Sequence, residues 1–258
     1  MRLRQVIFNH EQKEGEVNIM FVNYAHRGAS TYAPENTMTS FRLGIQMGAN
    51  GIETDIQETK DGKLVLFHDD TIERCSNGKG RIADYTYDEL LKLDFGSWKN
   101  DRFKGERIVL FEDFAKEFFP LDLTFALELK VANIEKKVHD IIMRYGVAEK
   151  VYVSSFSFEY LEKMSKLTPK LKLCWLIFDS ISQESIDRLK AIDGDQISPK
   201  CALATEEGVL LANRNGLGVR LWGVSDVVCM KKACKLNTEG MTVNFPDELT
   251  KYLSTSKN

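Results

Sequence analysis

The residues best suited to acid–base chemistry lie at the ends of apolar segments. His26 and Arg27 follow the apolar segment 18–25, and His68 closes the short segment 63–68. Imidazoles take up and release protons near neutral pH. A histidine beside an arginine is unusual in a core strand, so we expect both side chains to face a ligand.

Three carboxylates occupy comparable positions. Glu53 and Asp55 are two residues apart in "GIETDIQ" (51–57), and Glu128 lies in "LTFALELK" (123–130). On a strand, residues two apart point to the same face. Close carboxylates repel one another and are costly to bury without compensation. A hard divalent cation would remove this conflict, and we predict a site for Mg²⁺ or Ca²⁺, both of which prefer oxygen ligands.

Two cations complete this group of residues. Arg27 and Lys130 could hold an anion beside the metal, because both donate charge-assisted hydrogen bonds. Three carboxylates, two histidines and two cations together indicate metal-assisted phosphoryl transfer.

The elements that must position these residues alternate regularly between strands and helices. We expect strands at 18–25, 51–57 with 63–68, 123–130, 150–156, 172–178, 195–200, 218–225 and 240–245. We expect helices at 33–48, 86–93, 133–145, 157–166, 182–190, 205–214, 226–236 and 246–253. This order indicates a parallel sheet covered by helices.

The predicted fold class is α/β, a TIM (β/α)8 barrel with a small insertion after the second strand. Eight units in 258 residues favour this closed barrel over an open Rossmann-like sheet, and no G-x-G-x-x-G follows the first strand. We interpret 1–18 as an N-terminal extension and 19–258 as one barrel domain, with the insertion at about 70–110. In such a barrel the carboxyl ends of the strands form one rim, which would gather the polar residues.

The charge, the apolar segments and the cysteines of the chain argue against several kinds of binding partner. The chain has 35 Lys and Arg against 38 Asp and Glu, a net charge of -3, which argues against a nucleic-acid binder. We find neither a signal peptide in the first twenty residues nor an apolar run that would insert stably in a membrane. Five cysteines without a C-x-x-C argue against a zinc–thiolate site and favour a reducing, cytoplasmic location. The oligomeric state is not indicated.

Several separated motifs resemble the glycerophosphodiester phosphodiesterase family over roughly residues 20 to 250. They are "HRG" (26–28), "PENT" (34–37), "GIETDIQETKDGKLVLFHDD" (51–70), "LELK" (127–130), "VSSF" (153–156), "LWGVS" (221–225) and "TVNFPDEL" (242–249). The resemblance implies a TIM barrel that hydrolyses small glycerophosphodiesters to sn-glycerol 3-phosphate and an alcohol.

The resemblance also implies a role for each matching residue. The metal ligands would be Glu53, Asp55 and Glu128; the catalytic pair His26 and His68; the phosphate-binding cations Arg27 and Lys130; and the aromatic wall beside the glycerol Trp222. The chain departs from the family pattern at Asn244, where members usually have Asp, and at Trp222-Gly223-Val224-Ser225 in place of Trp-Thr-Val-Asn.

Some residues allow a second interpretation. Glu35 and Asn36 could simply begin a helix, or Glu35 could support His26 or Arg27, as the resemblance suggests. Trp222 could be a core aromatic. Asp69 is expected to be a turn residue or a supporting partner. His139 lies away from the predicted rim, and we expect it at the surface.

Two other functions remain as alternatives. A phospholipase D-like or phosphoinositide-cleaving barrel would need an apolar lip, which the sequence does not indicate. A catalytically inactive binding barrel would not need the full set of histidines and carboxylates. For the enzyme we favour His26 as general base and His68 as general acid, with either water or the substrate's own glycerol hydroxyl as nucleophile.

Overall fold

The computed structural model of the protein describes residues 21–255. In this part of the chain eight parallel strands close into a barrel, because β1 pairs with both β2 and β10. The barrel strands are β1 (Val22–His26), β2 (Gly51–Glu58), β5 (Thr124–Leu129), β6 (Val151–Ser155), β7 (Lys172–Ile177), β8 (Gln196–Pro199), β9 (Gly218–Val224) and β10 (Gly240–Val243). The predicted TIM barrel is confirmed; the expected extension 1–18 lies outside the described residues.

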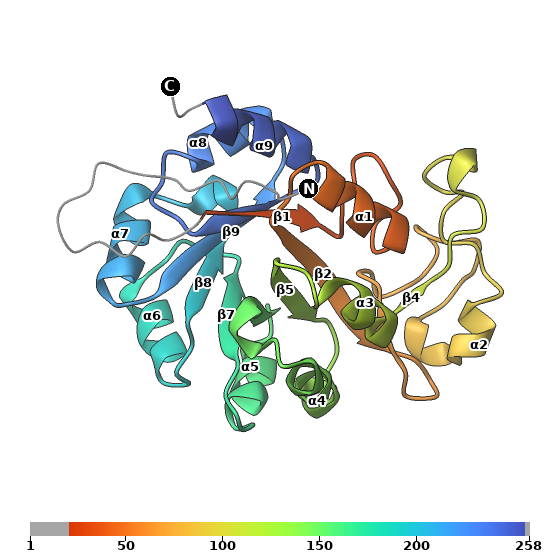
Figure 1. Ribbon diagram of the computed structural model, residues 1–258. Coiled ribbons are helices and arrows are strands. Elements are labelled where there is room, and N and C mark those ends of the chain that lie inside the picture. Colours follow the sequence, from red (N-terminus) through yellow and green to blue (C-terminus); the bar gives the residue numbers. More distant parts are fainter. Residues whose placement is uncertain (1–20, 256–258) are drawn as a thin grey trace.

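Helices surround the strands on all sides (Figure 1). They are α1 (Met38–Gln46), α3 (Phe111–Phe118), α4 (Glu135–Tyr145), α5 (Phe158–Ser165), α6 (Gln183–Lys190), α7 (Glu206–Arg214), α8 (Val227–Ala233) and α9 (Pro246–Thr255). The short helix α2 (Tyr87–Leu90) lies outside this ring, in the inserted segment. The sequence analysis missed α3. Its buried Phe111, Phe114, Ala115 and Phe118 recur at helical spacing, a signal that could have revealed it.

The inserted segment begins at the carboxyl end of β2. The short strand β3 (Leu64–Leu66) pairs antiparallel with β2, and β4 (Val109–Leu110) pairs antiparallel with β3. The segment between them contains α2 and has its own small apolar core, which includes Phe67. Figure 1 shows this segment to one side of the barrel, next to α1 and α3. Burial of Phe67 fixes the backbone next to His68.

Strand β2 is buried from Gly51 to Gln57, as expected for a strand enclosed on both faces. Ile52 and Ile56 pack into the apolar layer formed with α3 and α4. Since side chains alternate along a strand, Glu53 and Asp55 point to the opposite face, toward the barrel interior. The fold therefore places two acidic side chains inside the barrel.

The loop from β1 to α1 is folded tightly against the first turn of that helix. Gly28 has φ +83°, and a Cβ there would lie 2.4 Å from the backbone carbon of Ser40. The Ser40 hydroxyl donates to the Arg27 carbonyl at 2.8 Å. Thr37, and neither Glu35 nor Asn36, is the N-cap of α1, since its hydroxyl accepts from the Ser40 amide. This frees Glu35 and Asn36 for other contacts.

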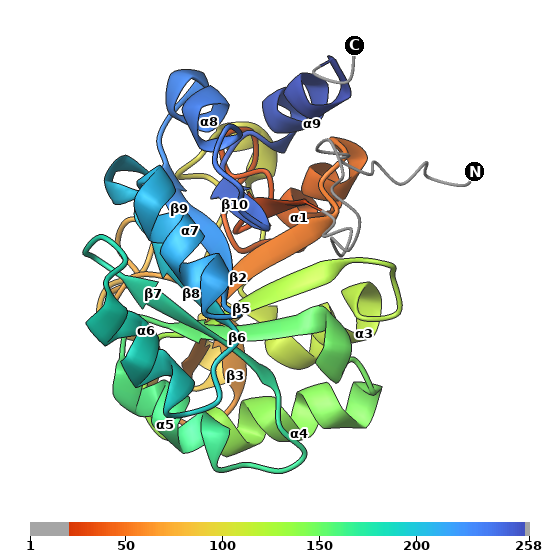
Figure 2. The same ribbon diagram turned by 90° about the vertical axis from the view of Figure 1, so that its left-hand side faces the viewer.

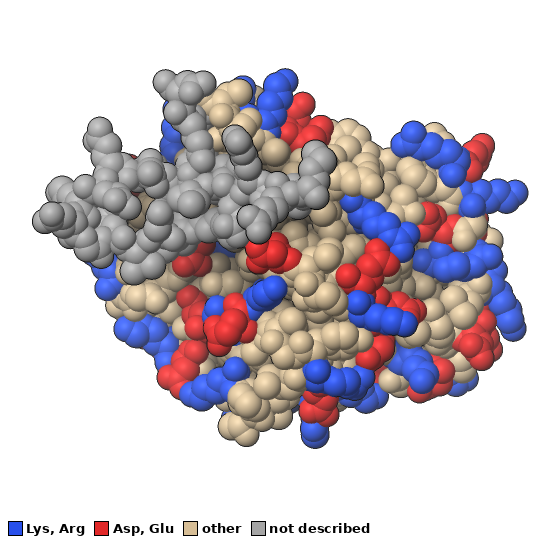
Figure 3. Space-filling view, in the orientation of Figure 1, with Lys and Arg blue, Asp and Glu red and all other residues tan. Residues whose placement is uncertain are grey.

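The surface carries mixed charge. On the face shown in Figure 3, lysines and arginines alternate with aspartates and glutamates, so neither sign dominates that face. Within residues 21–255 none of the helices combines the length and the apolar character needed to cross a bilayer.

Gly28→Ala should unfold at a much lower urea concentration than the unchanged protein. The left-handed backbone costs about 1–2 kcal/mol with a Cβ, and the clash with the Ser40 backbone adds about 1–3 kcal/mol. Gly105→Ala is the matched control, because Gly105 has φ +92° but nothing within 4 Å of its Cβ position. Equal losses in the two variants would show that the close approach to α1 contributes nothing.

Candidate active site

Three carboxylates meet inside the barrel at the carboxyl ends of neighbouring strands. Glu53 and Asp55 come from β2 and Glu128 from β5, where Asp55 and Glu128 are register partners. One oxygen of each lies within 4.8 Å of the others, and all three residues are buried. The structure therefore brings together the three residues predicted as metal ligands.

The nearby positive charges do not offset the effect of burial on two of these three carboxylates. Burial raises the pKa of Glu53 well above its usual value, and the charge of Asp55 raises it further. Burial and Asp55 likewise raise the pKa of Glu128, against the effect of Lys130, whose Nζ donates to Glu128 at 2.8 Å. Both glutamates would therefore be stabilised by a nearby cation.

Among the three carboxylates, the negative charge of Asp55 is the one that neighbouring groups stabilise most. Burial alone would raise its pKa, but the positive charge of Arg27 and a hydrogen bond from Asn36 help to hold it below its usual range. Arg27 Nε lies 3.2 Å and Asn36 Nδ2 3.0 Å from Oδ2. Oδ1 is buried and has no hydrogen-bond partner among the described residues. An unsatisfied buried oxygen beside two carboxylates fits a divalent oxygen-liganded cation such as Mg²⁺ or Ca²⁺.

His26, the last residue of β1, is held by one ring nitrogen. Its Nδ1 lies 2.6 Å from the side-chain oxygen of Asn244, which also accepts from the Ser30 hydroxyl at 3.0 Å. The amide oxygen can only accept, so Nδ1 carries the hydrogen and Nε2 keeps its lone pair. Burial and the charge of Arg27 lower the pKa of His26 to about 4. Near neutral pH, His26 is thus a neutral proton acceptor.

His68 is held in the same manner by a carboxylate. Its Nδ1 lies 2.6 Å from Asp69 Oδ1. Arg74 fixes Asp69 in turn, since Nε donates to Oδ2 at 2.5 Å and Nη2 to Oδ1 at 3.0 Å. The hydrogen bond from Arg74 lowers the pKa of Asp69, against the effect of burial. Asp69 is therefore a supporting partner, and His68 also keeps Nε2 for a ligand.

Glu35 joins Arg27 to Arg74. Its Oε1 accepts from Arg27 Nη1 at 2.8 Å and from Arg74 Nη2 at 2.7 Å, while Oε2 accepts from Arg74 Nη1 at 2.8 Å. Both Arg27 and Asn36 adopt left-handed backbone, with φ 55° and 56°. The Asn36 side chain accepts from Thr54 while it donates to Asp55. These contacts orient Arg27 toward Asp55.

Arg74 is a site residue that the sequence analysis did not identify. It lies in the inserted segment with a side chain about 46% exposed, and its only local signal is its position five residues after Asp69. Its partner Glu35 is 39 residues away in the chain. Only the fold reveals that Arg74 fixes the carboxylate that holds His68.

Trp222 lies near the carboxyl end of β9 and is partly exposed, so it is not a core aromatic. Its Nε1 donates to the Ile177 carbonyl at 3.1 Å. Its ring packs edge-on against Phe156 at 5.0 Å and Phe178 at 5.6 Å. Trp222 thus belongs to an aromatic cluster on the same rim as the histidines.

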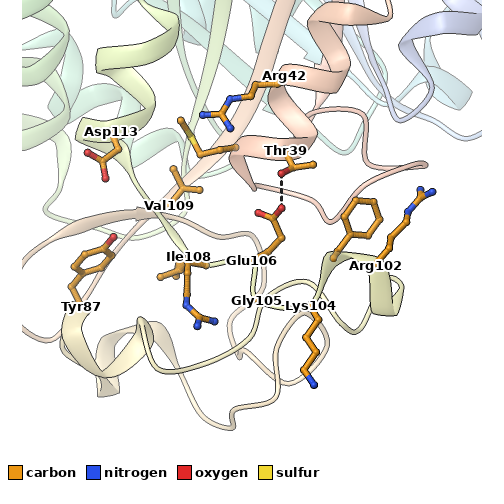
Figure 4. A pocket seen from close by; sticks show the side chains of 13 residues that line it. Thr39, Arg42, Tyr87, Arg102, Lys104, Gly105, Glu106, Ile108, Val109 and Asp113 are labelled. Atoms are coloured by element: carbon orange, nitrogen blue, oxygen red, sulfur yellow. Dashed lines mark hydrogen bonds between the residues drawn. The ribbon is translucent and has the colours of Figure 1, made fainter.

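Two further positions do not contribute to this site. His139, expected at the surface, is buried in α4, and its Nε2 lies 2.8 Å from the Pro169 carbonyl. A cavity of about 520 Å³ lies between the inserted segment, α1 and α3 (Figure 4). There the Thr39 hydroxyl donates to Glu106 at 2.5 Å, and none of the residues predicted for the site lines the cavity.

Comparison with known proteins supports one family. Residues 26–248 match the model of the glycerophosphoryl diester phosphodiesterase family. The chain is 33% identical to the glycerophosphodiester phosphodiesterase of Bacillus altitudinis, over 88% of this chain and 96% of that protein. It is 32% identical to the enzyme of the same name from Caldanaerobacter subterraneus subsp. tengcongensis, over 87% and 94%.

The fold is also found among solved structures. An Oleispira antarctica phosphodiesterase, solved in complex with the product sn-glycerol-3-phosphate, superposes with a TM-score of 0.84. The match covers 90% of this chain and 96% of the other at 24% identity, and so shows a shared fold.

The stabilisation of the protein by Mg²⁺ or Ca²⁺ should grow as pH rises. The pKa of Glu53 in the folded protein is raised well above its usual value of 4.5. Without metal, protonated Glu53 therefore stabilises the folded state below pH 4.5, and this stabilisation is lost as the pH rises through the folded-state pKa. A cation binds the deprotonated form and reverses this loss. At about 100 times its Kd, the ion should raise Tm by about 5–10 °C near pH 8, and by less near pH 5.

Glu53→Gln provides the control for this measurement. The variant should lose most of the metal-dependent gain in Tm and should melt higher than the unchanged protein when both are kept in a chelator at high pH. A gain that is independent of pH and survives in Glu53→Gln would contradict the proposed ligand set.

Proposed function

Because the chain belongs to the glycerophosphoryl diester phosphodiesterase family and is a phosphodiesterase, we propose that it hydrolyses glycerophosphodiesters to sn-glycerol 3-phosphate and an alcohol at the rim that carries His26 and His68. The observation that carries this proposal is the matched orientation of the two histidines. Each commits Nδ1 to a protein partner, Asn244 or Asp69, and keeps Nε2 for the substrate.

The substrate is a small molecule in this proposal. The complex of the Oleispira antarctica phosphodiesterase with sn-glycerol-3-phosphate supports a product of this size. Arg27 and Lys130 would bind the phosphate oxygens, because each lies against a carboxylate of the cluster. Trp222 would lie beside the glycerol. The cytoplasmic location expected from the sequence remains a prediction.

A divalent cation held by Glu53, Asp55 and Glu128 would supply Lewis-acid charge to the phosphate and to a glycerol hydroxyl. The three carboxylates would hold the ion, and the buried Oδ1 of Asp55 gains a partner in that arrangement. Glu35 and Asn36 would orient Arg27 and Asp55. Arg27 and Lys130 would stabilise the negative charge that develops on the phosphate oxygens.

The two histidines divide the proton transfers. His26, whose pKa is about 4, is neutral near pH 7 and accepts the proton of the attacking hydroxyl at Nε2. His68, hydrogen-bonded to the Asp69 carboxylate, donates a proton to the leaving alcohol. The attacking hydroxyl belongs either to water or to the glycerol of the substrate, which would form a cyclic phosphate that water then opens. Detection of a cyclic intermediate separates these two routes.

Replacing either histidine should slow turnover strongly while leaving the fold intact. His26→Ala and His68→Ala should each lower kcat/KM for glycerophosphocholine by about 10²–10⁴-fold, the usual contribution of one acid–base group. Release of sn-glycerol 3-phosphate measures the rate, and thermal melting checks the fold. His139→Gln, a histidine outside the site, should keep kcat. Near-normal turnover in both folded site variants would refute the assignment and favour an inactive binding barrel or a different centre.

Arg74 should act by positioning His68 through Asp69. Arg74→Gln should lower kcat by about tenfold, as replacements of supporting residues commonly do, with a smaller change in KM. Because both residues act through one imidazole, Arg74→Gln should have little further effect when combined with Asp69→Asn. Additive losses in the double variant would show that Arg74 acts elsewhere.

A further inference from the structure

A buried arginine lies in the barrel interior, below the three carboxylates of the site. Arg220 is in the middle of β9, which Figure 2 shows between β8 and β10. Its chain neighbours Val219 and Leu221 belong to the apolar layer between the strands and the outer helices, so the Arg220 side chain points inward. Only 1% of the residue is exposed. The proposed hydrolysis gives this buried cation no role.

The contacts of the guanidinium group place it near the barrel axis. Its Nε donates to Gln196 Oε1 on β8 at 3.2 Å, and its Nη2 donates to Cys174 Sγ on β7 at 3.5 Å. The guanidinium carbon also lies 5.3 Å from the ring centroid of Tyr24 on β1. Strands β7 and β1 lie on either side of β9, each beyond one intervening strand. A group that contacts side chains of both must extend into the barrel interior.

This position is one layer below the carboxylates. Tyr24 pairs with Gly51 of β2, and His26 pairs with Glu53, two residues further along both strands. Two residues of a strand span about 7 Å. In a barrel of this type the inward side chains form stacked layers. Arg220 and Tyr24 therefore belong to the layer next to that of Glu53, on the side of the amino ends of the strands.

Arg220 has no carboxylate at ion-pair distance within residues 21–255, because its hydrogen bonds go to a neutral amide and a thiol. Glu239 is connected to it only through Gln196, whose Nε2 donates to Glu239 at 2.7 Å. A buried charge without a direct partner is costly. Burial raises the pKa of Glu53, and the charge of Arg220 acts against this effect. The arginine and the carboxylates therefore compensate each other across the barrel interior.

We propose that Arg220 is an internal counter-charge of the cluster of Glu53, Asp55 and Glu128 and that it weakens the binding of the divalent cation there. The inference rests on the ligand set of the proposed function. Arg220 offers the ion no ligand atom and acts only through its positive charge. That charge stabilises the carboxylates when the ion is absent and repels the ion when it is present. The affinity of the site is thereby set below that of the three carboxylates alone.

The buried location makes this effect different from that of a surface cation. Water and salt screen buried charges much less than exposed ones. Arg188 on α6 is a matched arginine on the outside of the barrel, where its side chain is exposed. Its guanidinium carbon lies 4.1 Å from the ring of Phe158 and 5.1 Å from that of Trp175. It has aromatic contacts, as Arg220 has, but its charge is open to solvent.

Calorimetric titration of the full chain with Mg²⁺, and separately with Ca²⁺, tests the proposal. Arg220→Met removes the charge and keeps a long side chain. We expect this variant to lower the Kd of the ion by about tenfold, because one repulsive charge is removed from a buried site. A purely structural role of Arg220 predicts the opposite, a higher Kd. The decrease should persist in about 0.5 M NaCl, which screens exposed charges.

Three further variants keep the test decisive. Arg220→Lys keeps the charge and should have a Kd within about twofold of that of the unchanged protein. Arg188→Met removes an exposed charge and should change the Kd by less than about twofold. Arg220→Gln is also neutral, should lower the Kd as Arg220→Met does, and replaces that variant if it folds poorly. Thermal melting without metal checks the fold of each variant.

The outcomes separate this inference from the proposed function, because hydrolysis of glycerophosphocholine is measured on the same proteins. An unchanged or higher Kd in the folded neutral variants overturns the role of Arg220 and leaves the proposed hydrolysis standing. An equal decrease in Arg220→Lys or Arg188→Met assigns the effect to packing or to net charge and also overturns it. A lower Kd without hydrolysis by the unchanged protein supports the counter-charge and overturns the proposed function. Uptake of neither ion overturns both the ligand set and this inference.

Discussion

The repulsion among three buried carboxylates is the constraint on which the rest of the site depends. Glu53, Asp55 and Glu128 point into one barrel interior, where water cannot screen them. The surrounding residues compensate Asp55 well, through Arg27 and Asn36, but leave its Oδ1 without a partner and the pKa values of both glutamates raised. The cluster therefore has the charge and the donor atoms for a divalent cation, which would complete it.

The two histidines of the site are oriented by the same kind of contact. His26 and His68 are each fixed through Nδ1, by an amide in one case and a carboxylate in the other, and this difference suits them to different proton-transfer roles. Arg74 and Glu35 connect the His68 side of the site to Arg27, so that the inserted segment and the loop after β1 are joined by charged hydrogen bonds. The inserted segment therefore contributes residues that position the side chains of the site.

The polar and the apolar side chains of the rim come from different strands. Its polar part comes from β1, β2 and β5, and its apolar part from the ends of β6 to β9. Phe178, Leu203 and Val228, three exposed hydrophobic residues of this part of the rim, are separated in the chain by 25 residues at each step. Closing the barrel brings them to one edge.

The order of strands and helices and the common face of Glu53 and Asp55 could be predicted from local sequence, because periodicity and side-chain alternation are short-range properties. The number of these units indicated a barrel, but its closure depends on the long-range pairing of β1 with β10. The specific motifs also identified the family. Helix α3 was missed, although its phenylalanine spacing was visible. The support of His68 by Arg74, the burial of His139 and the grouping of aromatic side chains were decided only by tertiary structure. Those contacts join residues far apart in the chain, and only folding sets the distances between them.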